Sequence, residues 1–265
     1  MKTGKYERNT ARKKGRGGVL AVVIVLCVAV LVYAGYQLVQ ILSEDARSSQ
    51  EMSSFQQFTI DTDEAAQQSG SQATDGGIGF QVDFAGLRSQ NQDVVGWIRL
   101  EGTVLDYPVV QGEDNAYYLD HTVLGEENRA GSIFLDYRND SAMADANTVI
   151  YGHRMNNGSM FAELLNYAEQ EYYEAHPTLY LATPEQDYRL EVAIAGEAEG
   201  DLDFVTQAWA SEEDFEEALG ELENISAIDT DVSLEYGDKL VTLFTCVRGD
   251  AAKRFIVVCK LTPVG

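Results

Sequence analysis

The sequence predicts a mainly β fold, a closed antiparallel or mixed barrel that follows one transmembrane helix. Three observations lead to this prediction. A long uncharged apolar stretch lies near the N-terminus, about eight short runs rich in β-branched and aromatic residues follow it, and few helical stretches separate those runs. With 265 residues, the chain is long enough to bury a substantial core.

The charged residues are unevenly distributed along the chain. The first sixteen residues contain seven of the 19 Lys and Arg residues, whereas the rest of the chain holds 12 basic and 42 acidic residues. So acidic a body would be repelled by a phosphate backbone, which excludes nucleic acid as a partner. The acidity is more typical of a solvated surface than of a metal site, because no loop of alternating acids is present.

An uncharged stretch separates Arg16 from Glu44, and residues 19–42 within it are almost entirely apolar. As a helix, this segment would extend about 36 Å, enough to cross a hydrocarbon core of about 30 Å. The basic tail 1–18 before it predicts a single-pass protein of the cell membrane, with the N-terminus in the cytoplasm and the body outside. A cleaved signal peptide is the alternative, with 32–34 as its cleavage site.

Residues 43–79 are rich in Ser, Gln, Asp, Glu and Gly, which predicts a stalk or linker, partly helical near the membrane. Apolar density rises from Phe80 onward, so we expect a single folded domain over residues 80–265. Its first element is predicted to be a helix over 80–92, because Phe84 and Leu87 recur at helical spacing.

The predicted strands are short apolar runs bounded by Gly, Asp, Asn or Pro. They cover residues 94–102, 103–111, 131–138, 147–153, 178–184, 188–197, 239–246 and 254–261. Two helical stretches interrupt them, at 160–170 and 211–222. The second begins with Ser211 and is rich in acid in its first turn, as helix N-termini prefer.

Cys246 ends one of the predicted strands. A lone Cys at a strand end is usually a small buried hydrophobe, and Cys259, in the middle of the last strand, fits that description. Cys246 differs because Arg248, Lys253 and Arg254 follow within a few residues, and nearby positive charge stabilises the reactive thiolate. We therefore predict that Cys246 is a nucleophile.

Two further residues complete the candidate catalytic group. His153 follows the strand 147–151 and, among the three histidines, is best placed to exchange a proton with Cys246, although a structural histidine is the alternative. Arg254 opens the last strand, and a hairpin could bring it beside the end of the previous strand. Its permanent charge and several donors suit a developing oxyanion, although a solvated strand-end charge is the alternative.

Longer segments make these signals specific. Residues 93–121, 130–139, 147–155, 242–246 (TLFTC) and 254–258 (RFIVV) resemble, in order, the class B sortases, cysteine transpeptidases of Gram-positive bacteria. The resemblance covers about residues 80–265. It implies the eight-stranded sortase barrel with N-terminal helices and, near 211–222, an extra helix before the cysteine strand. Arg154 stands where class B members commonly have Asn, and Phe244 where many have Ser, which leaves the three central residues in place.

The resemblance also implies the reaction and its participants. The thiolate would attack the Thr carbonyl of a C-terminal sorting signal on a surface protein, and an amine of a peptidoglycan precursor or a pilin subunit would resolve the thioester. No cofactor or metal is implied. Residues expected to line the substrate groove by position are Asn115, Leu119, Tyr151 and Thr245.

Two alternatives remain at this point. Cys246-Val247-Arg248 is similar to the cysteine motif of L,D-transpeptidases, although the Ser-His-Gly prefix of that motif is absent. A catalytically silent surface binding module is the other alternative, in which Cys246 would have no function.

Overall fold

The computed structural model describes residues 16–62, 77–199, 208–246 and 253–265, and it divides into two compact units. Unit 1 is Met1–Glu44 and unit 2 is Asp45–Gly265. Helix α1 (Arg16–Phe55) starts in the first unit and ends in the second. Its apolar part reaches a mean hydropathy of 2.5 over an 18-residue window, so the helix is long and apolar enough to cross a membrane.

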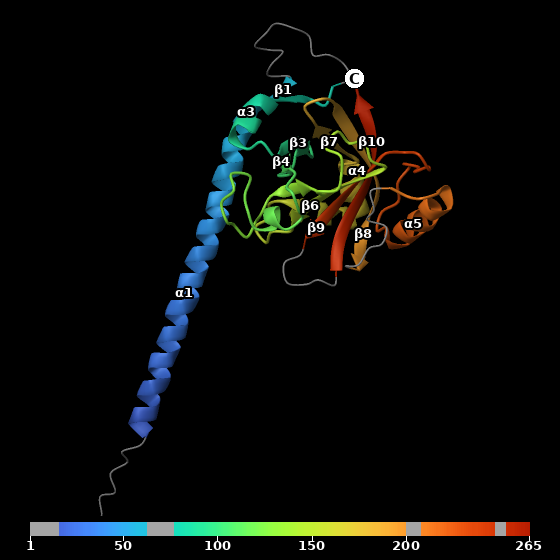
Figure 1. Ribbon diagram of the computed structural model, residues 1–265. Coiled ribbons are helices and arrows are strands. Elements are labelled where there is room, and N and C mark those ends of the chain that lie inside the picture. The colour runs from blue at the N-terminus through green and yellow to red at the C-terminus, as the bar shows by residue number, and fades with distance from the viewer. Residues whose placement is uncertain (1–15, 63–76, 200–207, 247–252) are drawn as a thin grey trace, which may run out of the picture. The chain divides into compact units, whose positions relative to one another are not determined.

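Eight strands of unit 2 form a closed barrel, which confirms the predicted fold class (Figure 1). They are β3 (Val94–Arg99), β4 (Asp106–Val110), β5 (Ile133–Leu135), β6 (Asn147–His153), β7 (Thr178–Ala182), β8 (Asp187–Glu199), β9 (Leu240–Cys246) and β10 (Lys253–Val264). Around the barrel the order is β10-β8-β7-β3-β4-β5-β6-β9. The pairs β4–β5 and β6–β9 are parallel and the others are antiparallel, so the barrel is mixed.

Alternation along the strands divides the core between the inside and the outside of the barrel. In β9, Val241 and Leu243 belong to the cluster that fills the barrel, whereas Leu240 and Phe244 belong to a second cluster on its outer surface. Helix α5 (Glu212–Ile225) covers that second cluster with its apolar face, and Figure 1 shows α5 beside β8. Strand β9 is therefore buried on both faces.

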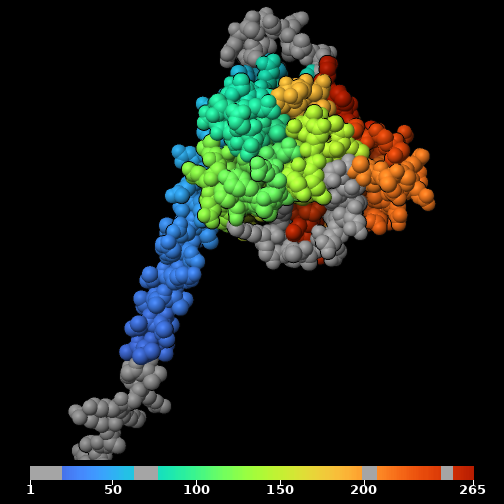
Figure 2. Space-filling model, in the orientation of Figure 1, coloured from blue at the N-terminus to red at the C-terminus, as the bar shows by residue number. Residues whose placement is uncertain are grey.

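Short helices surround the barrel. They are η1 (Gln56–Phe58), α3 (Phe84–Gln90), η2 (Tyr117–Leu119), η3 (Phe161–Ala168) and α4 (Gln170–Ala175). Figure 2 is a space-filling view in the same orientation. In this view, the segments of the chain coloured green and yellow-green form much of the near face of the second unit. The orange helix α5 lies at the edge of that face.

The predicted helix over 80–92 is wrong in its first turn. Residues Phe80–Val82 form strand β2, which pairs with β1 (Thr59–Asp61), and the helix α3 begins only at Phe84. Asp83 separates the two elements, because its carboxylate accepts a hydrogen bond from the amide of Gly86 at 2.9 Å and caps the helix. The predicted helix over 160–170 is a 3₁₀-helix, η3, followed by the short α4.

The predicted helix 211–222 is present as α5, and its start agrees with the sequence. Ser211 is the N-cap, and its hydroxyl accepts a hydrogen bond from the amide of Asp214 at 3.2 Å. The linker over 43–79 and the domain start at residue 80 stay predictions. The compact unit itself begins earlier, at Asp45, and Phe55 is fully buried within it.

Two glycines give opposite predictions for the docking of α5. A Cβ at Gly196 would lie 2.0 Å from the carbonyl oxygen of Ile225, whereas a Cβ at Gly220 would meet nothing within 4 Å. Gly196→Ala should destabilise the protein by about 1–3 kcal/mol through overpacking against backbone. Gly220→Ala should stabilise it by up to about 1 kcal/mol, because Gly is unfavourable inside a helix.

Urea unfolding of the two variants and the wild-type chain in detergent measures both effects. Equal changes in unfolding free energy, or a stabilising Gly196→Ala, would contradict this description of the α5 contact.

Candidate active site

The parallel pairing of β6 with β9 brings two distant segments of the chain together. The register runs without interruption from Asn147↔Leu240 to His153↔Cys246. At its start, the Thr242 hydroxyl donates to the Oδ1 atom of the buried Asn147 at 2.9 Å, which ties the two strands through side chains as well. His153 and Cys246, the two residues predicted to exchange a proton, thus occupy paired positions at the same end of the ladder.

The neighbouring strand β10 brings Arg254 to the same end of the sheet. Strands β9 and β10 are antiparallel, and their ladder includes Ile256↔Phe244. One residue further on, the Thr245 hydroxyl bonds to both backbone groups of Phe255, accepting from its amide at 2.9 Å and donating to its carbonyl at 3.1 Å. The backbone ladder ends at Ile256↔Phe244, so Arg254, two residues before Ile256 on β10, lies near the end of β9 at which Cys246 stands.

These positions share the outer face of the barrel. The rings of Tyr151 and Phe244 lie edge to face with centroids 5.4 Å apart, and the Arg254 guanidinium lies 6.0 Å from the Phe244 centroid. Because strand residues two apart lie on the same face, His153 lies on the face of Tyr151, and the register position of Cys246 lies on the face of Phe244. The side chain of Cys246 is outside the described part of the structure, as is Arg248.

His153 is 5% exposed, and its Nε2 atom lies 2.6 Å from the carbonyl oxygen of Leu119. A carbonyl oxygen only accepts hydrogen bonds, so this contact requires the hydrogen on Nε2. In the neutral imidazole, Nδ1 is then the nitrogen with a free electron pair. The contact with Leu119 therefore assigns Nδ1 as the atom that could accept a proton.

Local backbone contacts hold the Leu119 carbonyl in place. The Asp114 carboxylate accepts from the amides of Ala116 and Tyr117 at 2.8 and 2.9 Å, at the start of η2. On the other side, the Ser132 amide donates to the Tyr118 carbonyl at 2.9 Å. Gly131 permits this approach: its φ is +58°, and a Cβ there would lie 2.5–2.6 Å from the carbonyl oxygens of Tyr118 and Leu119.

A buried carboxylate that the sequence did not single out lies next to this site. Asp136, which follows β5, has no exposed surface and accepts hydrogen bonds from the side chains of Arg138, Asn115 and Tyr151. Burial raises the pKa of Asp136, but the bonds from Arg138, Asn115 and Tyr151 outweigh it, and the net pKa lies below its ordinary value. Such a group stabilises the fold above its ordinary pKa, and that contribution is lost as the pH falls through the lowered value.

The four predicted substrate-lining residues differ in their surroundings. Tyr151 and Asn115 turn their polar groups to Asp136, and Leu119 offers its carbonyl to His153. The Thr245 side chain is 1% exposed and links β9 to β10, on the strand face opposite that of Phe244. Substrate contacts by these residues stay predictions.

Cys259 lies in the core of the barrel. It is fully buried in the cluster inside the barrel, as predicted, and burial raises the pKa of its thiol. A thiol with a raised pKa is a poor nucleophile at neutral pH. Cys259 is therefore a structural residue.

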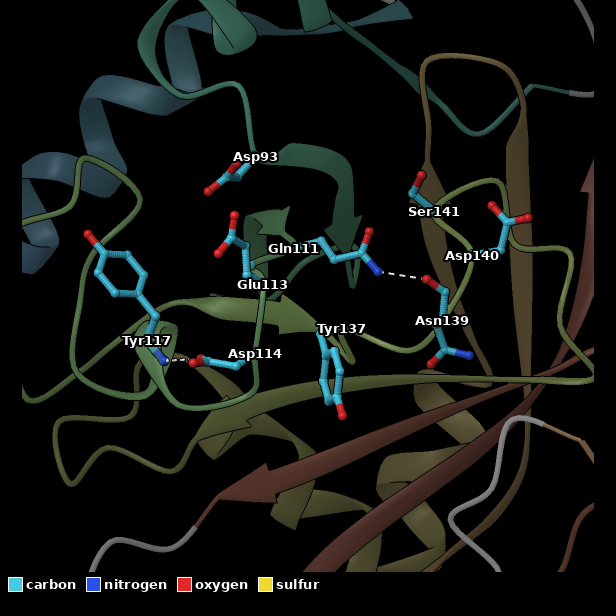
Figure 3. Close-up of a pocket in the computed structure, with 10 residues that line it drawn as sticks. Asp93, Gln111, Glu113, Asp114, Tyr117, Tyr137, Asn139, Asp140 and Ser141 are labelled. Atoms are coloured by element: carbon cyan, nitrogen blue, oxygen red, sulfur yellow. Dashed lines mark hydrogen bonds between the residues drawn. The ribbon is translucent and has the colours of Figure 1, made fainter.

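A cavity of about 710 Å³ lies beside the segment that leads to Leu119 (Figure 3). Figure 3 shows Tyr117 bonded through its amide to Asp114, and Gln111 bonded to Asn139 across the cavity wall. Its lining is mainly polar and acidic, with carboxylates from Asp93, Glu113, Asp114 and Asp140. Neither His153 nor Arg254 is among the described residues that line this cavity.

Comparison with known proteins agrees with this geometry. Residues 98–262 match the sortase domain family. Sortase B of Staphylococcus aureus is 32% identical over 248 residues, covering 92% of this chain and 97% of that protein. Sortase B of Listeria monocytogenes is 39% identical over 160 residues, covering 60% of this chain and 65% of that protein.

A solved structure gives the same result. The structure of a Staphylococcus aureus sortase B–substrate complex superposes with a TM-score of 0.73 at 30% identity, covering 84% of this chain and all of that one. The chain belongs to the sortase family of cysteine transpeptidases. Within that family it is a class B sortase. The class B sortase assignment therefore replaces the alternative of an L,D-transpeptidase-like enzyme.

Proposed function

We propose that this chain is a membrane-anchored transpeptidase in which Cys246 is the nucleophile, His153 transfers protons and Arg254 stabilises negative charge. The observation that carries the proposal is the pairing of His153 with Cys246 at the end of the β6–β9 ladder, in a chain of the class B sortase family. The position of Arg254 beyond the end of the β9–β10 ladder, with its guanidinium over the Phe244 ring, supports the charge-stabilising role proposed for Arg254.

The proposed reaction has two acyl transfers. The Cys246 thiolate, whose proton is carried by His153 as an imidazolium, attacks the carbonyl carbon of Thr in a C-terminal sorting signal and forms a C–S bond. The tetrahedral intermediate then breaks its C–N bond, while His153 gives a proton to the departing amine. In the second transfer, an acceptor amine attacks the thioester and gives a proton to His153, and the Cys246 thiolate leaves. Sulfur and imidazole thus return to their starting states.

Arg254 suits the stabilising role because its guanidinium keeps its charge at any working pH. The side chain is partly buried, and its guanidinium lies over the Phe244 ring, which restricts its motion. A cation held beside the reacting carbonyl would lower the energy of the oxyanion in both tetrahedral intermediates.

The substrates of the proposed reaction are a surface protein with a C-terminal sorting signal and an amine. Likeness over the full length of a sortase B–substrate complex from Staphylococcus aureus supports a peptide substrate of this kind. We propose that the acceptor is an amine of a peptidoglycan precursor, with a pilin subunit as the alternative. The exposed edge of Tyr151 and the segment around Leu119 are the proposed groove wall.

The membrane anchor is proposed to be the apolar part of α1, residues 19–42. The seven basic residues that precede it favour an N-terminus that stays in the cytoplasm. The catalytic unit would then lie outside the membrane, where its sulfhydryl can reach surface proteins and wall precursors. A cleavage of the chain near residue 34 would contradict the anchor.

An acyl adduct tests the nucleophile directly. The full chain in detergent is mixed with a library of peptides containing Thr-Gly or Thr-Asn, and the products are analysed by mass spectrometry. We expect cleavage after Thr and an acyl adduct on the peptide that contains Cys246. Cys246→Ala should abolish both, and Cys259→Ala should retain both because that thiol is fully buried. Cleavage by the Cys246→Ala variant would remove the proposal.

Arg254 is tested against its neighbour Lys253. Arg254→Ala should lower the cleavage rate by about two to three orders of magnitude, as the loss of an oxyanion donor typically does. Lys253 is exposed and pairs with Glu197 at 3.2 Å, so Lys253→Ala should change the rate by less than about threefold. Steady-state kinetics on one sorting peptide measures both. Equal losses in the two variants would show that Arg254 contributes only general positive charge.

A further inference from the structure

The Asp136 carboxylate is buried, and both of its oxygens accept hydrogen bonds. Its Oδ1 atom accepts from the amide and the Nε atom of Arg138, both at 2.9 Å. Its Oδ2 atom accepts from Arg138 Nη2 at 2.7 Å, Asn115 Nδ2 at 2.9 Å and the Tyr151 hydroxyl at 3.0 Å. With one cationic partner, the charge is neutralised within the network. A carboxylate bonded in this way restricts the motion of the segments that carry its donors.

One donor belongs to the segment that carries the Leu119 carbonyl. Asn115 is held at both ends of its amide, since its Oδ1 atom also accepts from the Tyr137 amide at 3.0 Å. Only three residues separate Asn115 from Leu119, and the 3₁₀-helix η2 makes most of that connection rigid. The bond from Asn115 to Asp136 therefore fixes where the Leu119 carbonyl lies.

A second donor belongs to the strand that carries His153. Tyr151 and His153 are two residues apart on β6, so they lie on the same face. Because the Tyr151 hydroxyl bonds to Asp136, the outer face of this strand end is tied to the same carboxylate as Asn115. Both partners of the contact between His153 and Leu119 are thus linked through one group.

We propose that Asp136 is a positioning residue, which fixes the hydrogen bond from His153 Nε2 to the Leu119 carbonyl and so selects the imidazole tautomer used in catalysis. The proposal rests on the proton-transfer role proposed for His153. Under this proposal, Asn115 and Tyr151 also have a positioning role, in addition to any contact with the substrate, because their polar groups bond to Asp136.

A carboxylate is required at this position because every neighbour is a donor. An asparagine in place of Asp136 would turn an NH₂ group toward one of two sets of donors: the amide and Nε of Arg138, or Nη2 of Arg138 with Asn115 and Tyr151. One set of bonds would be lost and donors would oppose donors. Loss of the Oδ2 set would release Asn115, and the Leu119 carbonyl would no longer be held for His153.

Asp106 provides a matched control. Its carboxylate also accepts from one ring donor and one guanidinium, Trp97 Nε1 at 2.6 Å and Arg99 Nε at 2.8 Å, and it also joins neighbouring strands. Within the described residues, the side-chain bonds of Asp106 go to Trp97 and Arg99 of β3, and not to η2 or β6. Asp106→Asn should therefore lower stability as Asp136→Asn does, without the effect on His153.

The experiment compares full-length Asp136→Asn, Asp106→Asn and wild-type chains in detergent. Three quantities are measured: the Tm, kcat and KM for a cleaved sorting peptide, and the ¹⁵N chemical shifts of His153, assigned by their loss in His153→Ala. In Asp136→Asn, we expect kcat to fall by about 10- to 100-fold with KM changed by less than about threefold, because orientation and not binding is lost. At a pH high enough for the His153 ring to be neutral, the ¹⁵N shifts should move from the Nε2–H form toward a mixture of tautomers.

A wild-type kcat in Asp136→Asn, or an equal fall of kcat in Asp106→Asn at an equal fall of Tm, would overturn the proposal. If Asp136→Asn does not fold, Tyr151→Phe replaces it, since this variant removes one donor and keeps the ring. It should lower kcat by about three- to tenfold and shift the same ¹⁵N signals, and unchanged values would overturn the proposal.

The ¹⁵N signals also separate this proposal from the proposed function. A wild-type chain that cleaves no sorting peptide would remove the function, yet a tautomer change in Asp136→Asn would still support the positioning role. A cleaving wild-type chain whose His153 signals stay unchanged in Asp136→Asn would remove the positioning role alone.

Discussion

The parallel ladder between β6 and β9 is the constraint on which the candidate active site depends. Its strands are separated by more than eighty residues, and their pairing carries His153 and Cys246 to one end of the barrel. A slip of one residue would move either position to the opposite face of its strand. The buried bond between Asn147 and Thr242 opposes such a slip, since a shifted register would leave two buried polar groups unpaired.

The other parts of the site are connected to that ladder one after another. Thr245 joins β9 to β10 just before the strands reach Cys246 and Arg254. The segment around η2 then supplies the Leu119 carbonyl to His153, and Asp136 holds that segment against the barrel. Rigid strands therefore set the position of the residues, and a polar network adjusts the orientation of the imidazole.

Much of the fold could be predicted from the sequence, because the barrel strands are short runs rich in β-branched and apolar residues, bounded by turn residues. The eight runs proposed from this pattern all correspond to strands of the barrel. The error at residues 80–83 arose because apolar spacing alone could not reveal the pairing of β2 with β1 or the cap formed by Asp83. Local signals do not report a partner strand that lies about twenty residues away.

The site was predictable only in part, for a related reason. The three proposed catalytic residues lie at the ends of strands and carry distinctive chemistry, whereas Asp136 looks like an ordinary acid after a short strand. Its importance comes from donors 21 and 15 residues away in the chain, which only the folded structure brings together. An acid after the buried run Ile133–Leu135, with an arginine two positions later, was the one signal available.

A crystal structure of the full chain with a sorting-peptide mimic bound covalently to Cys246 tests the central claim most directly. The account predicts that the sulfur, the His153 ring and the Arg254 guanidinium surround one carbonyl group, with His153 within hydrogen-bond reach of the reacting atoms, about 3 Å or one water away. A bound peptide whose carbonyl lies on another face of the barrel from His153 would contradict it.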